Sequence, residues 1–131
     1  MTEYSLVFVY GTLMKGKHNH HVMDRAEGKF ISKAYIKNKE MFIVGGIIPG
    51  VIEGKGKVYG EIYKVPKKKM YVLDTLEGYD ARYDDGTYLR RWVNPYLIPS
   101  MKRIRAQYYR FNHSVHPDNR VPSGDYNQVT R

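Results

Sequence analysis

Two carboxylates stand close together in the segment "PKKKMYVLDTLEG", residues 66–78, which is the best helix prediction in the chain. Asp74 and Glu77 are three residues apart, so their side chains lie on nearly the same face of a helix. The negative end of the helix dipole disfavours an ionised carboxylate there and raises its pKa. Such a carboxylate suits proton transfer near neutral pH. Two solvated, slightly unfavourable surface charges would give the same pattern.

A second candidate is the stretch "VFVYGTLMKG", residues 7–16, in which a short apolar run ends abruptly on Gly11 and Thr12. Glycine lets the backbone bend and lets another molecule approach the main chain closely. The break is therefore either a plain turn or a loop whose bare backbone amides meet a ligand.

Histidines gather in two other segments, without a spacing typical of metal sites. They are His18, His20 and His21 in one segment, and His113 and His116 in the other. Metal ligation needs three or four converging groups that other residues hold in place. We therefore predict no metal site.

The helix that carries the two carboxylates has clear ends. Pro66 suits the first helical position and Gly78 suits the residue past the end. Apolar residues recur at helical spacing and predict an inward-facing stripe. Its members are Met70, Leu73 and Leu76, with Val72 as a partial fourth.

The rest of the chain is mostly strand-like. Residues 6–10 form a continuous apolar run, as expected for a strand covered on both faces. The stretch "KVYGEIYKV", residues 57–65, alternates in the manner of a half-buried strand, in which Glu61 and Tyr63 are expected to support the structure. Further strands are predicted at 33–36, 40–44, 88–93 and 102–111, a turn-rich segment at 45–56, and a short helix from Asn19 to about Arg25.

Composition limits the class of protein. A chain of 131 residues with 42% hydrophobic residues is expected to fold as one globular domain. The absence of cysteine excludes disulfides, thiol nucleophiles and cysteine zinc sites. No signal peptide or membrane-spanning stretch stands out, so we expect a soluble cytoplasmic protein. The net charge of +9 would attract anionic partners.

Several short motifs occur in an order that resembles one protein family. They are "VYGTLMKGKHNH" (9–20), "GKVYGEIYKV" (56–65), "LDTLEGYD" (73–80), "YLRRWV" (88–93) and "PSGDY" (122–126). Over roughly residues 6–126 the chain resembles the gamma-glutamylcyclotransferase-like superfamily. The resemblance implies an α+β fold, a small mixed β-barrel flanked by a few short helices. It implies a single domain over residues 1–131, with a polar C-terminal tail at 113–131.

The resemblance also implies a reaction. Enzymes of this family cleave a gamma-glutamyl amine, amide or peptide, because the free α-amine of the substrate attacks its own γ-carbonyl. The products are 5-oxoproline and a free amine or amino acid. The reaction is intramolecular, so positioning supplies much of the rate gain and neither a protein nucleophile nor a cofactor is needed.

The family's functional positions can be carried over to this sequence. The glutamate of the "LDxxEG" motif falls on Glu77, the implied general acid and base, with Asp74 as the rival carboxylate. A site hydroxyl is expected from Tyr88, which directly precedes a strand, in preference to Tyr83. The implied substrate-binding positions are Tyr10, Gly11, Thr12 and Leu13.

A second hypothesis is a non-catalytic member of the same fold that binds an anionic ligand or nucleic acid through its basic surface. The complete Glu77 motif favours the enzyme, because a module that binds anions has no use for a carboxylate that repels them. We expect a small-molecule gamma-glutamyl substrate, no membrane partner and, at most, weak non-specific binding of nucleic acid. Neither the leaving amine nor the oligomeric state follows from the sequence.

Overall fold

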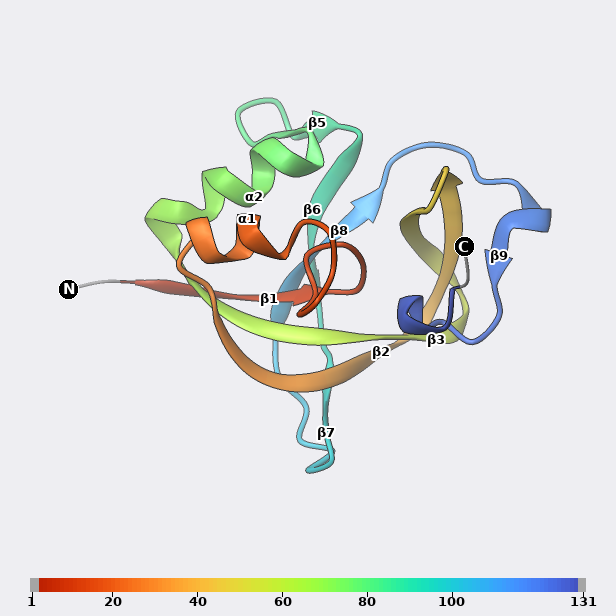
Figure 1. Ribbon diagram of the computed structural model, residues 1–131, viewed down its shortest axis with the longest axis horizontal. Coiled ribbons are helices and arrows are strands. Elements are labelled where there is room, and N and C mark those ends of the chain that lie inside the picture. Colours follow the sequence, from red (N-terminus) through yellow and green to blue (C-terminus); the bar gives the residue numbers. More distant parts are fainter. Residues whose placement is uncertain (1–2, 130–131) are drawn as a thin grey trace.

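The computed structural model describes residues 3–129. Its main element is a curved sheet with the strand order β6-β8-β1-β3-β2-β7, and β9 pairs with β2 (Figure 1). The strands are β1 (Tyr4–Val9), β2 (Lys29–Gly45), β3 (Ile48–Pro66), β6 (Tyr88–Val93), β7 (Tyr96–Ile98), β8 (Ala106–Phe111) and β9 (Arg120–Val121). The sheet is mixed, because β1 and β8 are parallel whereas its other pairs are antiparallel. The α+β class is confirmed, although the sheet curves without closing into a barrel.

The β2–β3 hairpin is longer than the sequence predicts. The expected strands at 33–36 and 40–44 are parts of the single strand β2, whose pairing with β3 shifts register around Lys37 and Lys39. The segment 45–56 was expected to be turn-rich, but most of it belongs to β3. At Gly50 an added Cβ would lie 2.8 Å from Cγ of Phe111. Glycine occurs at this position because the strand packs closely against Phe111, and not because the chain turns there.

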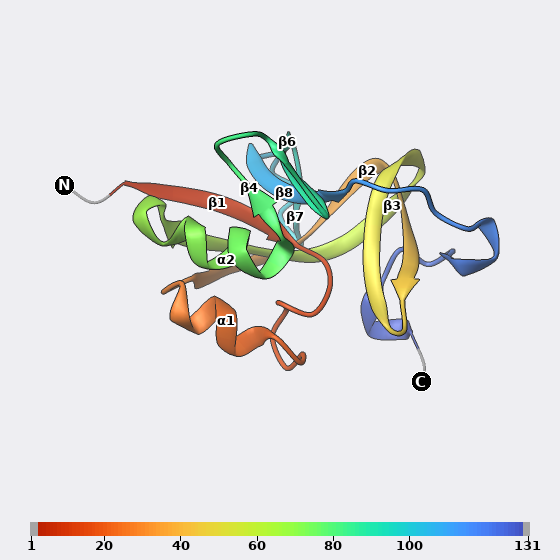
Figure 2. The same cartoon turned by 90° about the horizontal axis from the view of Figure 1, so that it is seen from above.

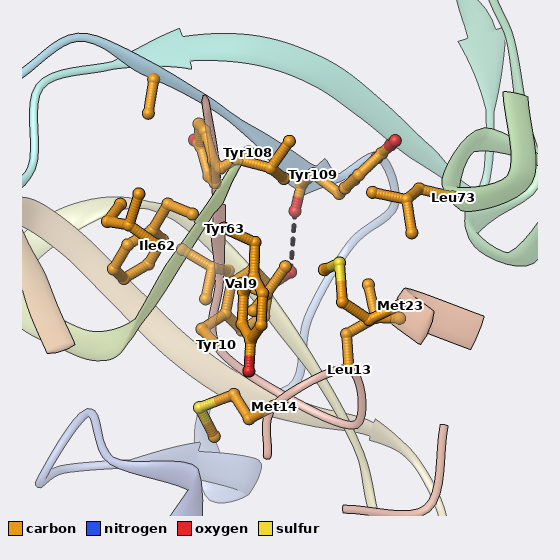
Figure 3. Packing of buried hydrophobic residues seen from close by; sticks show 14 of the residues in the cluster. Val9, Tyr10, Leu13, Met14, Met23, Ile62, Tyr63, Leu73, Tyr108 and Tyr109 are labelled. Atoms are coloured by element: carbon orange, nitrogen blue, oxygen red, sulfur yellow. Dashed lines mark hydrogen bonds between the residues drawn. The ribbon is translucent and has the colours of Figure 1, made fainter. Parts of the chain in front are cut away.

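The core is built around β1, which lies between β8 and β3 in the middle of the sheet. Val7, Phe8 and Val9 are all buried, so this strand is covered on both faces, as its continuous apolar run predicts. Figure 3 shows the end of β1 packed among residues from β3, β8 and both helices.

Two short helices lie side by side next to β1 (Figures 1 and 2). They are α1 (His20–Arg25) and α2 (Met70–Glu77). Gly78 ends α2 in the left-handed conformation, with φ of 66°, as its position predicts. Pro66 was expected at the first helical position, but it is the last residue of β3. A 3₁₀ turn at Lys67–Lys69 separates it from α2.

The inward face of α2 also differs from the predicted stripe. Met70, Val72 and Leu73 are buried, but Leu76 is 39% exposed, and the buried polar residue on this helix is Asp74. The reason is that α2 contacts the sheet with the face that carries Asp74, which is paired with β6 and β8 as described below. Leu76 instead faces the cavity of the candidate site.

The segment after β8 packs against the hairpin (blue in Figure 1). Here β9 pairs with β2, and the hydroxyl of the buried Tyr126 donates a hydrogen bond of 2.6 Å to the carbonyl of Ile47. The remaining elements are the two-stranded β4 (Tyr79–Asp80) and β5 (Asp85–Gly86), and 3₁₀ turns at Pro117–Asn119 and Tyr126–Gln128. No helix within residues 3–129 is long and apolar enough to cross a membrane.

Candidate active site

One cavity, with a volume of about 470 Å³, brings separate segments of the chain together. It lies between the loop after β1, the tip of the β2–β3 hairpin, the end of α2, and parts of β6 and β8. All the site residues expected from the sequence line it: Tyr10, Gly11, Thr12, Leu13, Glu77 and Tyr88. A cavity of this size is typical of a small-molecule site.

Glu77 supplies the acidic group of the cavity. It is the last residue of α2 and is partly buried. Burial, followed by repulsion from the Asp74 carboxylate, raises the pKa of Glu77 from 4.5 to about 7. The direction agrees with the expectation from its position at the helix end, but the causes are burial and a neighbouring charge. Among the described residues that line the cavity, none is a lysine, an arginine or a second acid.

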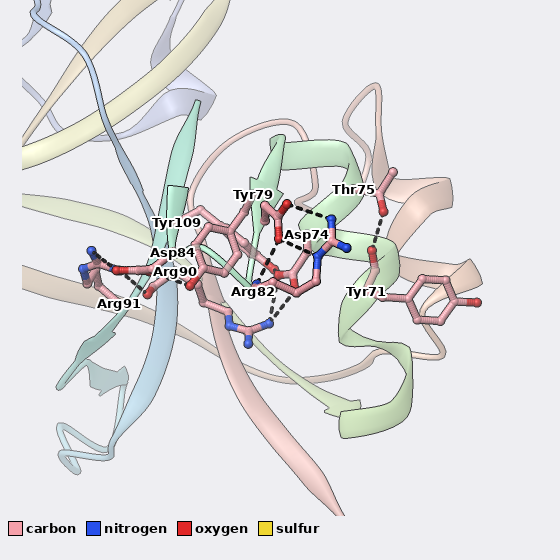
Figure 4. Close-up of polar contacts among 10 residues, drawn as sticks. Tyr71, Asp74, Thr75, Tyr79, Arg82, Asp84, Arg90, Arg91 and Tyr109 are labelled. Carbon is pink, nitrogen blue, oxygen red and sulfur yellow. Dashed lines mark hydrogen bonds and ion pairs between the residues drawn. The ribbon is translucent and has the colours of Figure 1, made fainter. Parts of the chain in front are cut away.

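Asp74, the rival carboxylate, has a structural role instead. Its Oδ1 accepts a hydrogen bond of 2.7 Å from the hydroxyl of Tyr109, and Nη1 of Arg90 donates to both carboxylate oxygens at 2.9 and 2.8 Å (Figure 4). These contacts tie α2 to β8 and β6. Asp74 is buried and does not line the cavity. Its position therefore favours Glu77 as the carboxylate that meets a ligand.

The loop after β1 is held by its own polar contacts. The backbone N–H of Asn19 donates to the carbonyl of Thr12 at 2.9 Å, and its side-chain amide donates to Thr12 Oγ1 at 3.0 Å. Within residues 3–129, no hydrogen bond has the backbone N–H of Gly11, Thr12 or Leu13 as its donor. All three residues line the cavity, and backbone amides without a protein acceptor are available to a ligand.

Gly11 is required by close packing. A Cβ built on it would lie 2.5 Å from Cγ of Pro49, at the tip of the β2–β3 hairpin. Its backbone is outside the left-handed region, so an unusual conformation is not the reason for glycine. The loop and the hairpin tip therefore meet directly at this residue, and together they form one wall of the cavity.

The two candidate tyrosines are clearly separated by their surroundings. Tyr83 is 75% exposed and does not line the cavity, whereas Tyr88 is buried and does. The hydroxyl of Tyr88 donates to the carbonyl of Pro49 at 2.8 Å. Burial, and then the nearby Glu77 charge, raises the pKa of Tyr88. The phenol thus stays protonated near neutral pH, and its oxygen can still accept a hydrogen bond from a ligand.

Several cavity residues were missed from the sequence. Tyr109 and Phe111 lie on the face of β8 opposite Ala106 and Tyr108, and all four are buried. The sequence could have indicated these residues, because apolar side chains occur on both faces of that strand. Ile48 and Pro49 come from the segment 45–56 that was expected to be turn-rich, and Val44 ends the strand expected at 40–44. The Tyr10 hydroxyl donates to the carbonyl of Tyr109 at 2.7 Å, which joins β8 to the loop (Figure 3).

Glu61 supports the loop from its other side. Its Oε1 accepts hydrogen bonds of 2.9 Å from the Tyr63 hydroxyl and from the backbone N–H of Lys15. It lines a separate small cavity of about 130 Å³ and not the main one. These contacts agree with the structural role expected from the sequence.

Comparisons with known proteins point to one family. The family model for "Gamma-glutamyl cyclotransferase, AIG2-like" matches residues 7–128. A protein of Methanocaldococcus jannaschii, provisionally named a gamma-glutamylcyclotransferase, is 37% identical over 122 residues, which cover 92% of this chain and 93% of that protein. The gamma-glutamylcyclotransferase family protein YtfP of Escherichia coli is 32% identical over 91 residues, or 69% of this chain and 74% of its own.

Solved structures agree. An AIG2-like protein from mouse superposes with a TM-score of 0.72 at 26% identity, covering 89% of this chain and 82% of that one. A protein from Pyrococcus horikoshii shares the fold, with a TM-score of 0.70 at 23% identity over 95% of this chain and 91% of its own. The ordered motifs, the fold and these matches lead to one conclusion: the chain belongs to the AIG2-like gamma-glutamyl cyclotransferase family.

Proposed function

We propose that this protein is a cyclotransferase that converts a gamma-glutamyl amine, amide or peptide into 5-oxoproline and a free amine or amino acid. The family match supports the reaction class. The observation that carries the proposal is a cavity containing one carboxylate, Glu77, whose pKa is raised to about 7. A group of that pKa can both accept and return a proton near neutral pH.

In the proposed reaction one bond of the substrate forms, one breaks, and Glu77 carries one proton between the two nitrogens. A bond forms between the α-nitrogen and the γ-carbonyl carbon, and the bond from that carbon to the leaving nitrogen breaks. Glu77 takes a proton from the attacking amine and gives one to the leaving amine. An α-amino group has a pKa of about 8, close to that of Glu77, so the transfer of its proton to Glu77 is not steeply uphill.

The loop after β1 would hold the glutamyl end of the substrate. No lysine or arginine is among the described residues lining the cavity, so we assign the α-carboxylate to the backbone amides of Gly11, Thr12 and Leu13, which donate to no protein acceptor. Amide groups fixed by the fold bind an anion without reorganising. Fixing the carboxylate leaves the α-amine free to meet the γ-carbonyl, and this positioning is the main catalytic gain of an intramolecular reaction.

The direct test is to incubate the protein with a panel of gamma-glutamyl amines, amides and peptides and to assay 5-oxoproline. We expect 5-oxoproline, together with an equal amount of released amine, from at least one compound of the panel. A protein that is folded but forms no 5-oxoproline from any of them would refute the proposed function.

A further inference from the structure

The motif "PSGDY", residues 122–126, takes no part in the proposed reaction, yet its last four residues all make specific contacts. The hydroxyl of Ser123 accepts a hydrogen bond of 3.2 Å from the N–H of Asp125. The Asp125 carboxylate in turn accepts one of 2.9 Å from the N–H of Asn127. Such local bonds between side chains and backbone fix the shape of a turn, here the 3₁₀ turn at Tyr126–Gln128.

Gly124 attaches this turn to β3. Its carbonyl accepts a hydrogen bond of 2.8 Å from the N–H of Tyr59, and its φ of 66° lies in the left-handed region. A Cβ built on Gly124 would overlap the backbone carbonyl of Lys57. Glycine is therefore required here both by the backbone conformation and by the close contact with β3. Tyr126, two residues further on, is thereby held next to the β2–β3 hairpin (Figures 1 and 2).

Tyr126 contacts two segments that contribute to the cavity wall, although it does not line the cavity itself. It is 5% exposed, and its hydroxyl donates the hydrogen bond of 2.6 Å to the carbonyl of Ile47, in the turn between β2 and β3. The residues on either side of this turn, Gly45 and Ile48, line the cavity. Nζ of Lys17, which follows the cavity residues of the loop after β1, lies 5.5 Å from the centroid of the Tyr126 ring.

The hydroxyl of Tyr126 holds a part of the hairpin tip that the other contacts do not reach. The bond from Tyr88 and the packing of Gly11 both involve Pro49, on the β3 side of the turn. Among the side-chain hydrogen bonds of residues 3–129, the bond from Tyr126 is the one that reaches the turn itself, at 46–47. A turn that loses such a bond opens more readily, and the cavity residues next to it move with it.

We infer that Tyr126 is a positioning residue, which holds the turn of the hairpin in place as part of the cavity wall and so sets the affinity for the substrate. This inference rests on the proposed cyclotransferase function and gives the "PSGDY" motif a role in substrate binding. Glu77 lies on α2, and the Tyr126 hydroxyl does not contact it. Loss of this hydroxyl should therefore affect binding and leave the proton transfer unchanged.

Tyr126→Phe removes the hydroxyl and keeps the ring. We expect the KM for a gamma-glutamyl substrate to rise at least about threefold and kcat to change less than about twofold, as for a loss of binding alone. The pH dependence of kcat/KM should keep its wild-type shape. A wild-type KM would overturn the inference, and so would a shifted pH profile, which would place Tyr126 in the proton transfer.

The matched control is Tyr79→Phe. It removes a hydroxyl that donates to Asp84 at 2.7 Å, from a residue that does not line the cavity. The KM of this variant should equal that of the wild type. An equal rise of KM in both variants would show that any lost tyrosine hydrogen bond has this effect, which contradicts a specific role for Tyr126.

Hydrogen exchange tests the same inference without a substrate. In Tyr126→Phe the backbone amides of residues 43–50 should exchange about fivefold faster than in the wild type, the scale expected for one lost hydrogen bond. In Tyr79→Phe the same amides should exchange at the wild-type rate. Unchanged exchange at 43–50 in Tyr126→Phe would mean that the hydroxyl does not hold the turn.

The two proposals fail in different ways. If 5-oxoproline forms but Tyr126→Phe changes neither KM nor the exchange of the hairpin tip, the positioning inference alone is wrong. If no compound of the panel yields 5-oxoproline, the cyclotransferase function is wrong, and hydrogen exchange then decides by itself whether Tyr126 holds the turn.

Discussion

Glu77 places a carboxylate where stability alone would favour a neutral side chain. Because its pKa is about 7 in the folded protein and 4.5 ordinarily, the folded state holds a proton that the unfolded state releases between these pH values. Stability therefore falls as pH rises through this window. The pKa difference corresponds to a cost of about 3 kcal/mol above pH 7. Such a cost is expected for a group retained for its chemistry.

This cost can be measured with Glu77→Gln, which keeps the shape of the side chain and removes its titration. We expect the free energy of unfolding of the variant, relative to wild type, to rise by about 2 kcal/mol between pH 5 and pH 8. Denaturant titrations of both proteins at the two pH values provide the comparison. Parallel pH profiles would mean that the pKa of Glu77 is not raised by the fold.

Asp74 should behave in the opposite way, because its charge is paired. Asp74→Asn leaves the Arg90 guanidinium without its partner at a largely buried position, which should cost about 3 kcal/mol in the free energy of unfolding. The matched control is Asp80→Asn, which breaks the exposed pair with Arg82 and should change stability little. Similar unfolding midpoints for the two variants would contradict a structural role for Asp74.

At the scale of elements, the site depends on contact between the loop after β1 and the tip of the β2–β3 hairpin. Gly11 packs against Pro49, and the Tyr88 hydroxyl binds the Pro49 carbonyl. Moving the hairpin tip would therefore disturb the loop amides and the tyrosine together. The loop after β1, the hairpin tip and Tyr88, which all line the cavity, are thus joined through Pro49.

Gly11→Ala tests this contact with the smallest possible change. The added methyl group must displace Pro49 or the loop, so we expect the KM for a gamma-glutamyl substrate to rise and stability to fall by about 1–3 kcal/mol. Gly45→Ala serves as a stability control, because a Cβ there meets no atom within 4 Å. If Gly11→Ala is as stable as Gly45→Ala and its KM is unchanged, the packing has no functional role.

Local features of the sequence predicted some of these elements well. Gly78 marked the end of α2, and the apolar run at 6–10 marked a strand buried on both faces, because each signal is read within one element. The hairpin was harder to predict. Glycine is needed at position 50 because Phe111 packs against it, and Phe111 lies 61 positions away in the chain.

The same limit applies to the site. Glu77 and the cavity residues of the loop after β1 were found from short motifs, whereas several apolar residues of the cavity were not. Ile48, Leu76 and Phe111 come from three elements that only the folded topology brings together. Leu76 was even expected in the core, because helical spacing alone does not distinguish a core face from a cavity wall.

At the scale of the whole molecule, the net charge of +9 remains to be explained. Several cations already lie over aromatic rings, such as Lys37 and Arg103 over Tyr96, at 4.9 and 5.6 Å from the ring centroid. Rings occupied in this way are poorly available for stacking with bases.

We therefore expect weak binding of nucleic acid that falls steeply with salt and is lost near about 0.15 M ionic strength. Fluorescence anisotropy with labelled single strands of two unrelated sequences, over a series of salt concentrations, measures this. Sequence-selective binding that persists at that ionic strength would favour the non-catalytic hypothesis.

The most direct test of the account is the turnover of Glu77→Gln with a gamma-glutamyl substrate that the wild-type protein converts to 5-oxoproline. Glutamine cannot carry the proton, so turnover should fall by about 10²–10⁴-fold, the usual contribution of a positioned general acid and base. Calorimetry should show that the variant still binds the substrate, because the loop amides remain in place. A Glu77→Gln protein that forms 5-oxoproline at the wild-type rate would contradict the account.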